Sequence, residues 1–140
     1  AVVSASLVLM TEFITRWDRF QMKRHALQTS LFQFRQLLPA PTHCPKGASR
    51  GISLGALLQL RDSFNSFLHN RSAYYLVGNI IKPLANPEKV SYAELAGPRA
   101  ADWFVSHYWG TPFRDFCDSL AKHANGELQG HNLAYWVCFC

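Results

Sequence analysis

Two stretches near the C-terminal end of the chain decide its fold: Trp103-Phe104-Val105-Ser106-His107-Tyr108-Trp109 and Leu133-Ala134-Tyr135-Trp136-Val137-Cys138-Phe139-Cys140. The first is rich in β-branched and aromatic residues and is bounded by Gly110 and Pro112, which is typical of a strand. The second is an almost continuous apolar run, as expected of a strand that is buried on both faces of a parallel sheet. Both stretches are therefore predicted to be strands.

A helix is predicted between these two strands. Thr111 can cap it, Pro112 suits its first turn, and Asn125-Gly126 ends it. Strand, helix and strand in this order form a βαβ unit, here over residues 99–140. We expect the unit to be incomplete, because the sequence stops inside its second strand. Apolar residues that recur at i, i+3, i+4 and i+7 give the helix one apolar face: Phe113, Phe116, Cys117 and Leu120.

A helical region is predicted over residues 1–98. Between 3 and 38, apolar residues recur at steps of three and four, and no Gly or Pro occurs before Pro39. One long helix or two collinear helices are therefore expected over 3–38. We expect the first apolar stripe of this segment to belong to the core, and a partner helix or a membrane surface is the alternative. The stripe consists of Val3, Leu7, Met10, Ile14 and Trp17.

The remainder of this region alternates loops and shorter helices. Residues 39–51 are rich in Pro, Gly and small polar residues and are predicted to be a loop. A helix is predicted over 53–69 with Ser53 as its N-cap, and another over 73–82, ended by Pro83. The predicted fold class is therefore α+β or α/β: a helix-rich N-terminal region followed by an incomplete strand–helix–strand unit.

The amino-acid composition indicates a folded domain with aromatic residues to spare for a partner. Of the 140 residues, 49% are hydrophobic and only 16% are charged, which argues against a disordered chain. Aromatic residues make up 14%, more than a small domain can easily bury, so some are expected to face a partner. The net charge of +5 is compatible with acidic partners and does not identify one.

A basic surface is expected on the N-terminal helix. Its cations alternate with Trp17 and Phe20, a pattern that can contact phosphate. A solvated helix face explains the same pattern and is preferred, so nucleic acid is not expected as a partner. The basic residues are Arg16, Arg19, Lys23 and Arg24.

The cysteines and histidines of the C-terminal half do not predict a metal site. They lack the compact ligand pairs of structural zinc sites, and Cys138 and Cys140 are expected to be buried core residues. No disulfide framework is expected, which favours an intracellular, reducing compartment. No metal or other cofactor is predicted. The residues considered were Cys117, His123, His131, Cys138 and Cys140.

Three segments resemble a known group of sequences: Ser91-Tyr92-Ala93-Glu94-Leu95, Trp103 to Gly110, and Ala134 to Cys138. They are similar to a large group of proteins from dinoflagellates and related algae. These share a Ser-Tyr-x-Glu-Leu segment, a Phe-Val-Ser-His-x-Trp-Gly strand and a Tyr-Trp-Val-Cys strand. That opening resembles Toll/interleukin-receptor-like (TIR-like) domains, whose first strand commonly reads Phe-Ile-Ser-His. The resemblance covers roughly residues 74–140.

The resemblance implies a flavodoxin-like sheet that binds ligands at the carboxyl ends of its strands. Ser106, His107 and Trp109 would lie at that edge and Arg114 near the following helix, so these four are the candidate ligand- or partner-facing residues. TIR-like enzymes that cleave NAD need a glutamate on a later helix, and the sequence ends before one. Consecutive strand residues such as Ser106 and His107 also point to opposite faces and cannot act as nucleophile and base. No catalytic residue is assigned, and no enzyme activity is expected.

Three hypotheses about function follow. The first is a non-catalytic interaction or scaffolding protein with a partial TIR-like unit. The second is an accessory structural subunit of a larger algal complex, with which a plastid or photosynthetic membrane is compatible. The third is a fragment of a TIR-like enzyme that cleaves NAD. A protein partner is expected under the first two hypotheses, and contact with a membrane surface through the N-terminal helix is an alternative.

Overall fold

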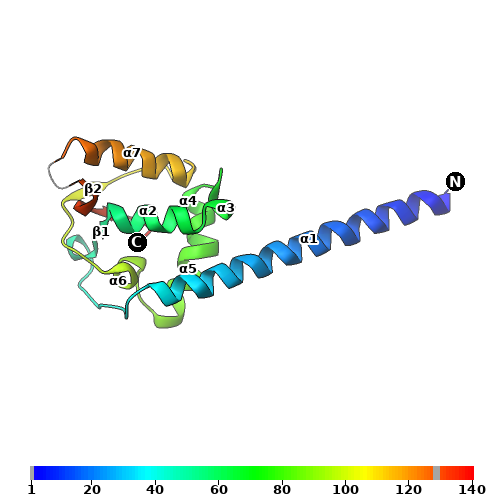
Figure 1. Cartoon of the computed structure of the whole chain (residues 1–140), viewed down its shortest axis with the longest axis horizontal. Helices are drawn as coiled ribbons and strands as arrows, with labels where there is room; N and C mark the ends of the chain where they lie inside the picture. The colour runs from blue at the N-terminus through cyan, green and yellow to red at the C-terminus, as the bar shows by residue number, and fades with distance from the viewer. Residues whose placement is uncertain (1, 128–129) are drawn as a thin grey trace.

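The computed structural model describes residues 2–127 and 130–140 of the chain. It is an α+β structure in which many helices surround a small mixed sheet (Figure 1). The elements in chain order are α1 Val2–Leu37, η1 Ala48–Arg50, β1 Ile52–Ser53, α2 Leu54–Ser63, α3 Asn65–Leu68, α4 Ala73–Leu76, η2 Val77–Ile81, α5 Lys82–Ala85, η3 Asn86–Glu88, α6 Tyr92–Ala96, β2 Trp103–Val105, α7 Phe113–Asn125, η4 Gly130–Asn132 and β3 Ala134–Val137.

Helix α1 is one continuous helix of 36 residues. It forms because neither Gly nor Pro interrupts the segment before Pro39. At about 1.5 Å per residue it is roughly 54 Å long, and Figure 1 shows it running out of the rest of the molecule toward the N-terminus. Only its C-terminal part packs on the hydrophobic core, through Leu27, Leu31 and Phe34.

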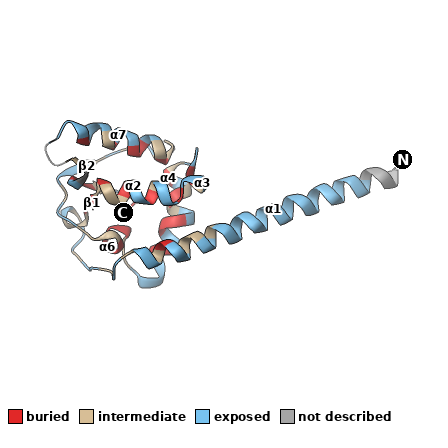
Figure 2. Ribbon diagram, viewed as in Figure 1, coloured by how far each residue is buried: buried red, intermediate tan, exposed pale blue. Residues whose placement is uncertain are grey.

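The expectation that the first apolar stripe of α1 lies in the core is wrong. Leu7, Met10, Ile14 and Trp17 are 54 to 69% exposed, and Figure 2 shows the outer part of α1 exposed along its length. The helix extends well past the domain, so these side chains have nothing beside them to pack against. The side chain of Val3 lies outside the described part of the chain.

The middle of the chain differs from its predicted form in two places. The helix predicted over 53–69 is interrupted at Phe64, which separates α2 from α3. Ser53 caps α2 as expected, because its side chain accepts a hydrogen bond from the Ala56 N–H. Pro83, in contrast, does not end the helix that begins at Ala73. The helix widens into a π-helical turn, η2, and continues through α5, which contains Pro83. Proline is tolerated in the first turn of a helical segment, where its missing N–H costs little.

The sheet has three strands in the order β1-β3-β2. β2 and β3 are parallel, with Trp103 opposite Tyr135 and Val105 opposite Val137, and α7 connects them. The order strand, helix, strand predicted for residues 99–140 is therefore present. β1 adds to the other edge of β3 in the antiparallel sense.

Two details of this unit were predicted wrongly. The first strand ends at Val105, whereas the apolar run suggests a strand to Trp109; the chain turns at Trp109 and Gly110, and the Thr111 N–H donates to the Tyr108 carbonyl oxygen across this turn. Thr111 does not cap α7: the residue before its first turn is Pro112, and no side chain caps the helix.

One hydrophobic core joins the helical region to the βαβ unit. Phe34 of α1 packs edge-on against Phe64, at 5.1 Å between ring centroids, and α2 packs against α7. The same cluster includes Tyr135 and Val137 of β3. Helices from both halves of the sequence therefore share one core with β3, and β2 lies at the edge of the sheet.

Candidate functional site

A groove of about 480 Å³ lies where β2 meets α7. β2 and the segment after it contribute one continuous run to its wall, and α7 contributes residues one turn apart. The lining residues are Trp103, Phe104, Val105, Ser106, His107, Thr111, Phe116, Ser119, Leu120, His123 and Tyr135.

The groove follows the outer edge of the sheet. β2 pairs with β3 on one side only, and the described part of the chain places no strand on its other side. The Asp102 N–H donates to the Ala134 carbonyl oxygen at 2.8 Å. The Leu54 N–H donates to the Leu133 carbonyl oxygen, so Leu133, and by alternation Tyr135 and Val137, direct their backbone groups toward β1, whereas Ala134 and Trp136 direct theirs toward β2. Trp103 and Val105, opposite Tyr135 and Val137, therefore face β3, and Phe104 is the β2 residue whose groups point away from it. β2 thus presents the unpaired N–H and C=O of Phe104 beside the groove.

The wall of the groove is largely aromatic. None of its described lining residues is Asp, Glu, Lys or Arg. His123 Nδ1 lies 2.9 Å from the Tyr135 hydroxyl, and the Trp103 ring packs edge-on against His123 at 5.0 Å. Burial raises the pKa of Tyr135, so the hydroxyl stays neutral. Hydroxyls of Ser106 and Ser119 add hydrogen-bonding groups at the rim.

His107 packs as an aromatic side chain. Its ring centroid lies 4.5 Å from that of Phe116 and 5.3 Å from that of Phe139. Both ring nitrogens are buried, and neither has a hydrogen-bond partner among the described residues. Burial lowers the pKa of His107, so the ring is neutral at physiological pH. It does not hydrogen-bond to Ser106, and the pair therefore lacks the contact that nucleophilic catalysis needs.

The four candidate ligand- or partner-facing residues divide into two pairs. Ser106 and His107 line the groove, whereas Trp109 and Arg114 do not. Trp109 Nε1 donates to Cys138 Sγ at 3.1 Å and so connects the chain segments that leave β2 and β3. The Arg114 guanidinium lies 3.5 Å from the Asp115 carboxylate, at the start of α7.

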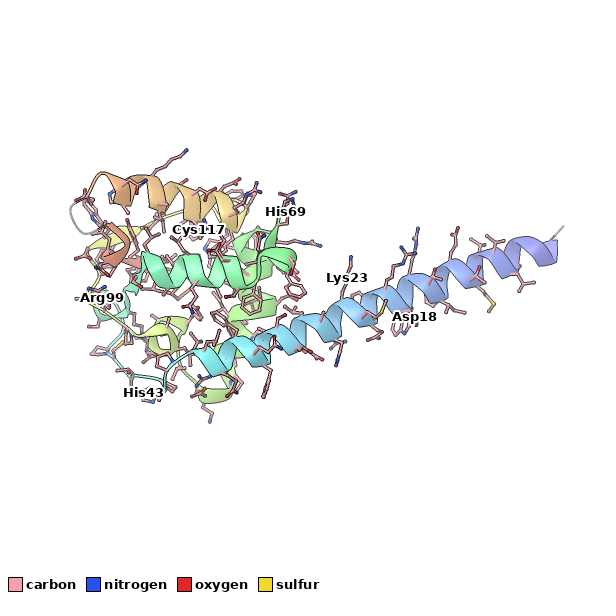
Figure 3. The ribbon with its side chains drawn as sticks, in the orientation of Figure 1. Asp18, Lys23, His43, His69, Arg99 and Cys117 are labelled. Carbon is pink, nitrogen blue, oxygen red and sulfur yellow. The ribbon has the colours of Figure 1, made fainter. Side chains whose placement is uncertain are left out.

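The predicted basic residues lie far from the groove, on the projecting part of α1. All four are exposed, and Figure 3 shows one of them, Lys23, together with Asp18, on the part of α1 that lies outside the domain. Acidic Glu12 and Asp18 lie among them, so this surface carries both signs of charge. No helix in the described part of the chain is long and apolar enough to span a membrane.

Of the two thiols predicted to be buried core residues, one is not. Cys140 is half-buried against the core. Cys138 is exposed, not buried, because β3 ends at Val137 and the chain turns there. Cys117 is buried, and burial raises its pKa to about 12. Among the residues described, no group of three His, Cys, Asp or Glu could hold a metal ion. The side chain of His131 lies outside the described residues.

Sequence reasoning did not assign a role to Glu94, the buried acidic residue of the Ser91 to Leu95 motif. Its side chain is 3% exposed. The carboxylate accepts hydrogen bonds from the Ser91 and Cys44 N–H groups at 2.8 and 3.0 Å, and it lies 3.3 Å from Arg50 Nη2. These hydrogen bonds, led by the one from Ser91, outweigh burial and lower its pKa to about 2. The spacing Ser-x-x-Glu, a capping box, was the available signal.

The groove offers apolar walls, neutral hydrogen-bonding side chains and an unpaired strand edge. No protein-family model, curated protein or solved structure matches this sequence.

Proposed function

We propose that this chain is a non-catalytic protein-interaction module whose docking element is the projecting part of α1, residues 2–26. The observation that carries the proposal is the exposed apolar face of this helix. Aromatic side chains lie in a row along it: Phe13 contacts Trp17, which contacts Phe20, at 6.4 and 6.3 Å between ring centroids. Contiguous apolar surface of this kind marks an interaction site in a soluble protein.

The partner is a helix, and a second copy of this chain provides one. Steps of four and three residues between Leu7, Met10, Ile14 and Trp17 are the spacing with which helices pack along each other. The polar side of α1 mixes acidic and basic residues, which lets two copies approach without strong repulsion. The basic residues of this side outnumber Glu12 and Asp18, which a helix lying on an anionic membrane would also show, so the test of this proposal includes vesicle binding as well.

We also propose that β2, α7 and β3 are the opening of a flavodoxin-like, TIR-like sheet. The parallel pairing of β2 with β3 and the Phe-Val-Ser-His-x-Trp-Gly motif support this. In a flavodoxin-like sheet the first strand has neighbours on both sides, which agrees with the unpaired outer edge of β2.

Sedimentation equilibrium of the full chain tests the docking proposal. We expect reversible dimers with a dissociation constant between about 1 and 100 µM. Ile14→Glu places a charge in the apolar stripe and should weaken the dimer at least tenfold. Thr15→Glu places the same charge on the polar side of the same turn and should change the constant less than about threefold.

Two outcomes would overturn the proposal. A chain that stays monomeric at several hundred micromolar does not pair through α1, and co-sedimentation of such a monomer with anionic phospholipid vesicles would assign the helix to a membrane surface. Release of nicotinamide from NAD by the purified chain would contradict the non-catalytic role.

A further inference from the structure

We propose that the groove beside β2 is a second docking site, and that it binds an extended segment of a partner protein as an added β-strand. The site differs from α1 in place and in chemistry. α1 offers apolar side chains to a helix, whereas β2 offers backbone hydrogen-bonding groups to a strand.

The first step of the argument is the strand edge. Phe104 directs its N–H and C=O groups away from β3, and no strand of the described chain pairs with it. An unpaired edge is a template on which another chain can form main-chain hydrogen bonds. Residues Trp103 to His107 line the groove without a gap, so a bound segment can follow the strand past its end.

The second step is the shape of the wall. Side chains of an extended segment alternate in direction, so every second one of them would enter the groove. There it would meet Phe116 and Leu120 of the core and the exposed rim residue Ser119 of α7. Trp103 and Phe104 are 46% and 65% exposed and would be covered by such a segment.

The third step is charge. Because none of the described lining residues is Asp, Glu, Lys or Arg, and burial keeps His107 neutral, a charged side chain would lose its water and gain no carboxylate, ammonium or guanidinium counter-ion in the groove. The segment is therefore expected to carry neutral side chains, apolar or hydroxyl-bearing, on its inward face. β-branched residues suit this best, because they favour the extended conformation.

The experiment uses the full chain and a fluorescent, capped peptide of alternating valine and threonine, flanked by lysine for solubility. Its fluorescence anisotropy should rise saturably, with a dissociation constant below about 1 mM. A second peptide carries N-methyl groups on alternate amides: it keeps every side chain and loses the donors that would pair with β2. We expect it to bind at least tenfold more weakly.

A matched pair of substitutions locates the site. Ser119→Trp fills the groove from α7 and should weaken peptide binding at least tenfold. Lys122→Trp adds the same ring to an exposed position of the same helix that does not line the groove, and should leave binding within about twofold. Circular dichroism of both variants verifies that α7 remains folded.

Equal binding of the two peptides, equal effects of the two substitutions, or no saturable binding of the unmethylated peptide would each overturn the strand-addition site. The Ile14→Glu variant separates this result from the helix proposal. It should bind the peptide as tightly as the unchanged chain does, even though its α1 no longer pairs.

Discussion

Glu94 connects the loop 39–51 to α6 and makes the fold sensitive to acid. Its pKa is about 2 in the folded chain and about 4.5 when exposed. Because the folded value is the lower one, the carboxylate stabilises the fold above pH 4.5, and this contribution disappears as the pH falls toward 2. The difference corresponds to about 3 kcal/mol. We expect Glu94→Gln to lower the free energy of unfolding by about that amount at pH 7.

Urea denaturation of both proteins at several pH values measures this effect. The difference between them should shrink below pH 4.5, where the unchanged chain loses its own stabilisation. Glu88→Gln is the control, because Glu88 pairs with Arg35 near the surface and such pairs contribute less than about 1 kcal/mol. A loss for Glu88→Gln as large as that for Glu94→Gln would show that the hydrogen bonds of the Glu94 carboxylate are not the cause.

The contacts of Glu94 also show a limit of prediction from sequence. The Ser91 to Glu94 spacing predicts a capping box from four neighbouring letters, because both partners are local. The hydrogen bond from the Cys44 N–H and the contact with Arg50 join residues more than 40 positions apart. No local pattern encodes such contacts, so the burial of Glu94 was not predicted.

At the scale of elements, α1 offers a comparison within a single helix. Phe34 is 3% exposed and Phe32 is 69% exposed. Phe34→Ala removes a ring that packs on Phe64 and should lower the free energy of unfolding by about 3 to 5 kcal/mol. Phe32→Ala removes the same atoms from a solvated position and should change it by less than about 1 kcal/mol. Chemical denaturation of the two variants measures both values, and similar values would mean that α1 does not pack as described.

The strands and helices were predictable where their patterns are local and long. The apolar spacing of α7 and the continuous apolar run of β3 each identify an element directly. β1 has only two residues, Ile52 and Ser53, and exists because β3 lies beside it. The prediction that Pro83 ends a helix is wrong because the π-helical turn before it, η2, lets the helix continue, and no local sequence pattern indicates such a turn.

At the scale of the whole molecule, α1 divides into a packed part and a projecting part. Spacing predicts which side chains share a face of the helix, but not whether anything covers that face, and this is why the stripe from Leu7 to Trp17 was expected in the core. Only the packed part, from about residue 27 onward, gains stability from the domain. An isolated stretch of helix is marginal in water.

Hydrogen exchange can therefore test both whether the N-terminal part of α1 projects from the domain and whether it pairs with a second copy. In a dilute sample, amides of residues 8–22 should exchange at least about 100-fold faster than those of residues 30–36, because only the latter open with the domain. If α1 pairs with a second copy, protection of residues 8–22 should rise with protein concentration, and Ile14→Glu should remove that rise. Concentration-independent protection of residues 8–22 that matches the domain would mean that α1 folds back onto the chain in solution.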